Sequence, residues 1–180
     1  MKTKVIITAL AGLLVSASSL AASPASYDTK FNVSANVPDS AKITDPSGRP
    51  ITDMDVELVP AASGKMEAQT AALKLWNNDV KQLNVALTLD DSQSATGGAF
   101  TLYSTGGGKL SDMTYKISAV TGNGTQEFAA SGDSKDFALV VNNTHGELPV
   151  AFKFVSDKNY DELGQGMYTG VVYANVVAKP

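Results

Sequence analysis

Apolar and polar residues alternate with a period of two along many short stretches of the chain. Near the start, Phe31, Val33, Ala35 and Val37 alternate with polar residues, which is the pattern of a strand with one apolar face. The same period recurs over residues 54–58, 83–89, 100–102, 113–119, 137–141 and 150–154. The pattern predicts a half-buried strand for each of these runs.

Residues that favour turns separate the alternating runs. Residues 45–48 read Asp-Pro-Ser-Gly, residues 122–124 read Gly-Asn-Gly, and residues 142–143 are a pair of asparagines. Glycine and asparagine tolerate a positive φ, and proline presets φ for a turn. The chain is therefore expected to reverse its direction at these points.

Two stretches depart from simple alternation. Residues 67–75 are rich in Ala and Leu, and they fit either a helix or a strand that enters the region of Trp76. Residues 167–177 are β-branched and aromatic on both faces, which predicts a strand buried on both sides in the middle of a sandwich. Together, about eight to ten short strands predict an all-β fold, an immunoglobulin-like antiparallel β-sandwich.

The first residues have the three-part order of a bacterial export signal. Lys2 and Lys4 precede an apolar run over residues 5–15, and small residues follow through Ala22. Residues 1–22 are therefore predicted to be a signal peptide that the mature protein lacks. Removing 22 residues from the 180 leaves 158, which is enough for one domain with a hydrophobic core.

Composition narrows the classes of partner and of chemistry. Lys2 and Lys4 leave with the signal, so the 14 basic residues become 12 against 18 acidic ones, and Arg49 is the single arginine. Nucleic acid is excluded as an expected partner, because phosphate backbones are bound by clustered Lys and Arg. The chain has no cysteine, so packing and backbone pairing must hold the fold without disulfides.

Residue types that support catalysis are sparse. His145 is the single histidine and lies among turn residues, so it is predicted to be a solvated loop residue. Asp157, Asp161 and Glu162 lack the spacing of a calcium loop of the EF-hand kind. Trp76 lies in an apolar run and is predicted to be part of the core. The sequence therefore predicts no enzyme, no catalytic residue, no metal site and no cofactor.

Four segments, taken in order, resemble a known family. They are the opening strand 31–37, the turn 45–50 leading to residues 56–60, the segment 75–79 followed by the run to residue 89, and the ending 166–172. In this order they resemble the alpha-class fimbrial major subunits, the colonization-factor type pilins of the alternate chaperone–usher pathway. One departure is that Val37-Pro38-Asp39 inverts the order of acidic residue and proline that such pilins have after the opening strand.

The resemblance implies an incomplete β-sandwich, completed by a donor strand from a neighbouring subunit. Residues 38–180 would then be the pilin domain, and residues 23–37 would be the donor-strand extension. The implied donor residues are Phe31, Val33, Ala35 and Val37. In this family a periplasmic chaperone pairs with the last strand first, and the implied pairing residues here are Val171, Val172, Tyr173 and Val176.

The implied function is that of a structural subunit of an adhesive surface fimbria. Its expected partners are identical or homologous pilin subunits, a periplasmic chaperone, an outer-membrane usher and a host-surface receptor. The expected route is export through the periplasm to the cell surface. Two alternatives stay open: a minor or tip subunit, or a carbohydrate-binding β-sandwich in which Trp76 stacks on sugar. The first strand of a self-complete sandwich would show the same alternation as residues 31–37.

Overall fold

The computed structural model describes residues 29–37, 40–106 and 112–180. The predicted signal peptide, residues 1–22, lies outside these residues. The chain divides into two units, Met1–Asn36 and Val37–Pro180. Among the described residues, no helix is long and apolar enough to cross a membrane.

The described residues of the first unit, together with Val37, form no helix or strand. Phe31 and Val33 are 80% and 90% exposed, and Val37 is 77% exposed. Ala35 is exposed as well. The alternation that predicts a strand here is therefore not realised as a strand in the single chain.

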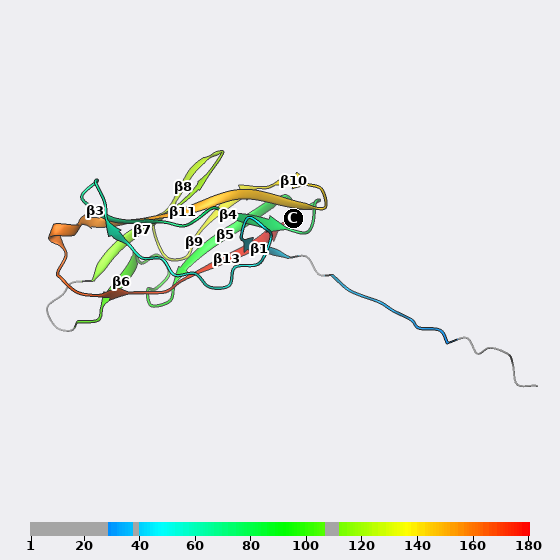
Figure 1. The fold of residues 1–180 in the computed structure, drawn as a ribbon, viewed down its shortest axis with the longest axis horizontal. Helices are drawn as coiled ribbons and strands as arrows, with labels where there is room; N and C mark the ends of the chain where they lie inside the picture. Colours follow the sequence, from blue (N-terminus) through cyan, green and yellow to red (C-terminus); the bar gives the residue numbers. More distant parts are fainter. Residues whose placement is uncertain (1–28, 38–39, 107–111) are drawn as a thin grey trace, which may run out of the picture. The chain divides into compact units, whose positions relative to one another are not determined.

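The second unit consists of antiparallel strands in two sheets (Figure 1). The larger sheet has the order β1 (Ala41–Thr44), β4 (Leu73–Asn77), β11 (His145–Asn159), β7 (Met113–Thr121), β6 (Phe100–Ser104) and β12 (Tyr168–Thr169). Joined to it are β2 (Val59–Pro60), β3 (Lys65–Gln69), β8 (Gly124–Phe128) and β10 (Val140–Asn142). The smaller sheet has the order β13 (Val172–Lys179), β5 (Asn84–Asp91) and β9 (Asp133–Ala138). This architecture confirms the predicted all-β antiparallel sandwich.

Strand β11 is the centre of the larger sheet. Along one edge it pairs with β4 and then with β3, and along the other edge it pairs with β10 and then with β7. One long strand thus aligns its sequence neighbour β10 and three strands from more distant parts of the chain, and Figure 1 shows it in gold.

The core lies between the two sheets and follows the period of two. Odd-numbered residues of β5 and β7 and even-numbered residues of β11 point into it, as Leu87, Ile117 and Phe152 illustrate with exposures of 0%, 1% and 6%. Full burial of such side chains contributes about 1.5 to 3 kcal/mol each. The alternating runs 83–89, 113–119 and 150–154 are therefore confirmed as half-buried strands.

For residues 67–75 the sequence fits either a helix or a strand, and the structure shows strands; for residues 54–58 the structure differs from the expectation. Residues 67–75 contribute to strands β3 and β4, and the only helical element among the described residues is the short 3-10 turn Tyr160–Glu162. The alternation over residues 54–58 predicts a strand, but these residues form none. Alternation alone does not make a strand, because a strand also needs a partner for its backbone groups.

The last apolar run is not in the middle of the sandwich. Strand β13 lies at the end of the three-stranded sheet, and its residues Tyr173 and Val177 are 64% and 51% exposed. The prediction of a strand buried on both sides is therefore wrong. Only one face of β13 meets the core, and the apolar residues of the other face are in solvent.

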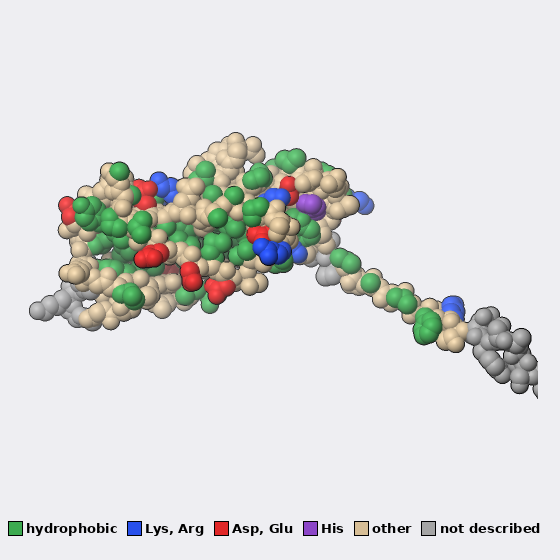
Figure 2. Space-filling model, viewed as in Figure 1, with side chains coloured by type: hydrophobic (Ala, Val, Ile, Leu, Met, Phe, Trp, Pro, Cys, Tyr) green, Lys and Arg blue, Asp and Glu red, His purple; other side chains and the backbone are tan. Residues whose placement is uncertain are grey.

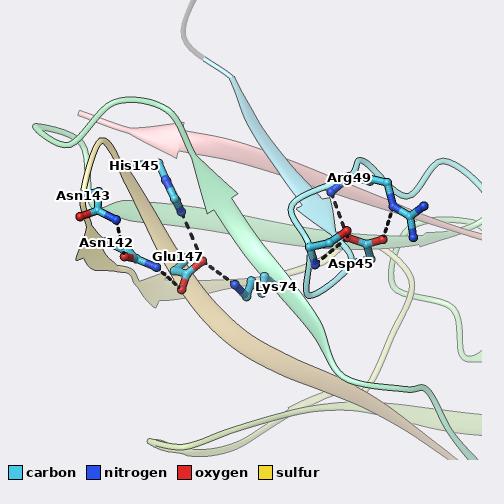
Figure 3. Close-up of polar contacts among 8 residues, drawn as sticks. Asp45, Arg49, Lys74, Asn142, Asn143, His145 and Glu147 are labelled. Atoms are coloured by element: carbon cyan, nitrogen blue, oxygen red, sulfur yellow. Dashed lines mark hydrogen bonds and ion pairs between the residues drawn. The ribbon is translucent and has the colours of Figure 1, made fainter.

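The predicted turn after β1 is held by the carboxylate of Asp45 (Figure 3). Its Oδ1 accepts hydrogen bonds from the Ser47 hydroxyl at 2.6 Å and from the Ser47 and Arg49 amides at 2.9 and 3.0 Å. Arg49 Nε donates to Oδ2 at 2.7 Å. These bonds lower the pKa of Asp45 well below its usual range, and the bond from the Ser47 hydroxyl has the largest effect.

A glycine in the loop before β9 is expected to be essential for stability. Gly132 has a φ of +86°, and a Cβ placed on it would lie 2.6 Å from Cγ2 of Thr96. Gly132→Ala should lower the free energy of unfolding by about 1 to 3 kcal/mol, because the left-handed conformation and the close contact both cost stability. Urea unfolding curves measure this change.

Gly122→Ala is the matched control. A Cβ at Gly122 meets no atom within 4 Å, and its φ lies outside the left-handed region. A change of less than about 0.5 kcal/mol is expected there. Equal losses in the two variants would contradict the strain at Gly132.

Candidate functional site

Strand β13 has one unpaired backbone edge. It pairs with β5 in a regular register that runs from Val172 opposite Asp91 to Lys179 opposite Asn84. No described strand pairs with its other edge. Such an edge presents free N–H and C=O groups to which another strand can add.

The side chains of β13 alternate between the core and solvent. Val172 and Val176 pack against the core cluster. Ala174 has the same parity, because it lies opposite the buried Leu89, and it is nevertheless exposed. The core is therefore left uncovered beside the middle of this strand.

An apolar groove with a volume of about 610 Å³ runs beside β13. Its floor includes the core residues Leu89, Tyr115, Ile117 and Phe152, each of which is almost fully buried. Residues 51–56 and Leu58 also line it, as do the residues of β13 from Val172 to Val176. Figure 2 shows hydrophobic side chains gathered along this face of the domain, with acidic side chains beside them.

The structure separates the four residues predicted for the last strand into two sets. Val172 and Val176 point inward and line the groove. Val171 and Tyr173 are 51% and 64% exposed and border the groove. The sequence could not assign these parities, because the run is apolar on both faces.

The predicted donor residues have their apolar side chains in solvent. Phe31, Val33 and Val37 are more exposed than the large apolar residues that line the groove, of which Tyr173 is the most exposed at 64%. This segment therefore has an apolar face whose burial would be favourable.

The groove offers apolar burial and an edge for backbone pairing. Burial, with a contribution from the charge of Asp91, raises the pKa of the Tyr115 phenol above its ordinary value. No cluster of three metal-ligating side chains occurs in the described part of the chain.

A second cluster of polar side chains lies on the outer face of the larger sheet, around Glu147 (Figure 3). Lys74 Nζ lies 2.7 Å from Glu147 Oε2, and Asn142 Nδ2 donates to Glu147 Oε1 at 2.8 Å. His145 Nε2 lies 3.3 Å from Glu147 Oε2. These contacts lower the pKa of Glu147 to about 2, and the contact with Lys74 has the largest effect.

Trp76 belongs to this outer face and not to the core. Strand β4 lies between β1 and β11, and the Trp76 indole has a neighbour from each: Lys42 Nζ lies 4.3 Å from the ring centroid, and the His145 ring centroid lies 5.5 Å away. The prediction of a core Trp76 is therefore wrong. His145 is also not a loop residue, because it begins β11 and only 25% of its side chain is exposed.

Comparisons with known proteins find similar folds among solved structures. Neither a protein-family model nor a curated protein sequence matches the chain. Among solved structures, the chain is similar to CfaE, the adhesive subunit of the CFA/I fimbria of enterotoxigenic Escherichia coli. The TM-score is 0.52 at 13% identity, over 77% of this chain and 43% of that chain. A mutant of CfaE gives a TM-score of 0.51 at 12% identity, over 78% and 43% of the two chains.

The chain shares its fold with part of a fimbrial adhesin. A chain from a chaperone–tip adhesin complex of CFA/I fimbriae biogenesis also matches, at a TM-score of 0.45 and 16% identity, over 78% of this chain and 42% of that one. The chain thus spans less than half the length of the structures it matches. At 12% and 13% identity, the similarity to CfaE and to its mutant shows a shared fold.

Sequence reasoning missed both the floor of the groove and the cluster around Glu147. The floor combines residues of β5, β7 and β11, and Lys74 is 73 residues away from Glu147 in the chain. The alternation marks each floor residue as buried but does not show which of them lie beside an open edge. Only the spacing of His145 and Glu147 in one strand could have placed these two on the same face.

The contacts of Glu147 predict a pH-dependent stability. Glu147→Gln should lower the free energy of unfolding at pH 7 by about 1 to 3 kcal/mol, because it removes the charge that pairs with Lys74. Folding lowers the pKa of Glu147 from 4.5 to about 2, so this stabilisation is present above pH 4.5 and is lost as the pH falls toward 2. The free energies of unfolding of wild type and of Glu147→Gln, measured from unfolding curves between pH 7 and pH 2, should therefore converge as the pH falls.

Glu127→Gln provides the control for this prediction. Glu127 pairs with Lys116 on the surface, where both side chains are about half exposed. Its loss should cost less than about 1 kcal/mol. A difference between wild type and Glu147→Gln that persisted undiminished at pH 2 would contradict the role of the carboxylate charge.

Proposed function

We propose that this protein is a structural subunit of an adhesive surface fimbria, and that it polymerises by donor-strand exchange. One observation carries the proposal: the sandwich has an unpaired edge at β13 beside an apolar groove that opens onto its core. The same chain has, at residues 31–37, a segment with the pattern of a strand and with its apolar side chains exposed. The segment of one copy fills the groove of the next copy.

The energetics favour such a joint. Burial of Phe31, Val33 and Val37 contributes about 1.5 to 3 kcal/mol each, and each backbone hydrogen bond adds about 0.5 to 1.5 kcal/mol. Ala35 adds less because its side chain is small. The sum is on the order of 10 kcal/mol before the cost of association, which is sufficient for a durable contact between subunits.

An unfilled groove requires a partner before assembly. Exposed core and an unpaired strand edge together favour aggregation. In the proposed pathway a periplasmic chaperone pairs with β13 and the residue before it, at Val171, Val172, Tyr173 and Val176, and the strand of the next subunit then replaces the chaperone. Assembly proceeds through an outer-membrane usher, after residues 1–22 have directed export to the periplasm. The mature protein is then part of a fimbria on the cell surface.

A minor or tip subunit is the second candidate, because the structures of similar fold are those of a fimbrial adhesive subunit. The carbohydrate-binding alternative loses support at Trp76. Stacking on sugar needs a free aromatic face. Lys42 and His145 contact the indole of Trp76 from the two neighbouring strands.

The apolar face of the tail provides the test. Val33→Asp places a charge where burial is proposed, and it should abolish polymer formation when chaperone, usher and subunit are produced together. The measurement is the yield of surface fibres by electron microscopy and of high-mass polymer on gels without boiling. The amount of chaperone–subunit complex should be unchanged, since the acceptor domain is intact.

Ser34→Asp introduces the same charge at the adjacent position, on the polar face of the segment. Polymer formation should continue in this variant, because residue 34 points away from the groove.

Deletion of residues 23–37 should give subunits that bind the chaperone and never polymerise. Normal fibre growth of the Val33→Asp variant or of the deletion variant would refute the proposed donor role.

A further inference from the structure

The chain between the tail and the domain is short. In the proposed function, residues 31–37 lie in the groove of a second copy. Ser40 is fixed to its own domain, because its amide donates to Oδ1 of Asn78 at 2.7 Å and its carbonyl accepts from the Asn78 amide at 3.3 Å. Three residue steps separate Val37 from Ser40, and they span at most about 11 Å. The second copy must therefore lie against the part of the domain that surrounds Ser40.

The surface beside this point is a turn of residues 78–82, which we call the root turn. Asn77, which is fully buried, holds it with both atoms of its side-chain amide. Its Nδ2 donates to the Gln82 carbonyl at 2.8 Å, and its Oδ1 accepts from the Asp79 amide at 3.2 Å. The tip of the turn is thus fixed in place, and its residue Val80 is 40% exposed.

A second exposed surface lies at the opposite end of the domain. Strand β11 pairs Gly146 with the residue that precedes the root turn, and it ends at Asn159, about 40 Å of strand away. Residues 160–167 follow, and we call them the far-end loop. They include Tyr160 and Met167, which are 51% and 68% exposed. Figure 1 shows this stretch in orange, at the other end of the domain from β10.

Repetition of one joint decides which end of the acceptor meets the root turn. Each copy gives one tail and receives one. If Val37 lay toward the acceptor's own root turn, the incoming domain would occupy the space through which the acceptor's tail leaves. A polymer of identical units instead repeats a contact between two different surfaces. Gly170 and Val171, which come soon after the far-end loop, line the groove at that end.

We infer that the root turn of one copy docks on the far-end loop of the copy that receives its tail. The inference rests on the proposed function, which supplies the tail. Both surfaces carry exposed apolar side chains, Val80 on one and Tyr160 and Met167 on the other. Burial of these side chains against one another is favourable. Each joint of the fibre then has a second contact besides the donor strand.

The charges of the two surfaces are complementary. Lys81 is exposed beside Val80, and Asp161 is exposed beside Tyr160. Neither charged side chain forms an ion pair with another described residue. Residues 157–162 carry three carboxylates against one lysine. Opposite charges favour the head-to-tail contact over a contact between two root turns, and docking fixes the angle between neighbouring subunits.

Pairs of introduced cysteines test the docking in fibres made by chaperone, usher and subunit together. One chain carries Val80→Cys with Met167→Cys, and another carries Val80→Cys with Tyr160→Cys. All three positions are exposed, so the domain should remain folded. A disulfide needs Cα atoms within about 7 Å, so two cysteines at opposite ends of one domain cannot join. At least one chain should therefore give a ladder of linked subunits after mild oxidation and boiling without reductant.

Val177→Cys in place of Val80→Cys is the matched control. Val177 is also an exposed valine, but it lies on β13 and outside the root turn. Its pairs should give at least about tenfold less linked product, because their Cα atoms are outside the range of a disulfide. Deletion of residues 23–37 from the Val80→Cys chains should abolish the ladder as well, since the tail brings the two surfaces together.

The outcomes separate the docking from the donor role. If the cysteine chains form polymer on gels without boiling and neither Val80→Cys pair gives a ladder, the docking is refuted and the proposed function stands. A ladder of equal yield in the Val177→Cys controls also refutes the docking, because it indicates random collision. If wild type forms no polymer with chaperone and usher, the proposed function itself fails.

Discussion

The free edge of β13 is the constraint on which the rest of this structure depends. A strand at the end of a sheet leaves half of its backbone groups without partners, and this strand also borders a groove that opens onto the core. Its neighbour Leu89 is almost fully buried, whereas Ala174, on the same face, is exposed. Water therefore reaches a surface that the packing of the two sheets prepares for burial. In the proposed function, polymerisation and the need for a chaperone both follow from this one gap.

The domain can carry such a gap because the rest of the sandwich is held independently of it. Strand β11 organises four neighbouring strands, and the core cluster continues through β5, β7 and β9 away from the groove. On the outer face, Glu147 joins side chains from β4, β10 and β11. No disulfide is needed, and none can form, since the chain has no cysteine. A rigid frame with one open side is suited to receiving a strand from elsewhere.

How far the sequence predicts this structure depends on whether a residue's environment is local. The runs in β5, β7 and β11 were predictable because one face is buried and the other is not, which the alternation reports directly. The prediction that residues 167–177 are buried on both faces is wrong, because Tyr173 and Val177 are apolar and yet face solvent at a sheet edge. The predictions for Trp76 and for residues 54–58 are wrong for a related reason. Contacts between distant parts of the chain decide which strands are neighbours and which segment has no neighbouring strand. The proposed donor role of residues 31–37 rests on a resemblance, because alternation alone fits a self-complete sandwich equally well.

Disulfide cross-linking between two copies tests most directly whether the tail of one copy fills the groove of another. The chain has no cysteine, so every disulfide must join two introduced cysteines. One copy carries Ala174→Cys in the groove, and the other carries a cysteine at one position from 31 to 37. A disulfide requires Cα atoms within about 7 Å. The account predicts linked dimers for at least one of positions 31, 33, 35 and 37, and far fewer for 32, 34 and 36. Equal linkage at both sets of positions, or closure within a single chain that carries both cysteines, would contradict it.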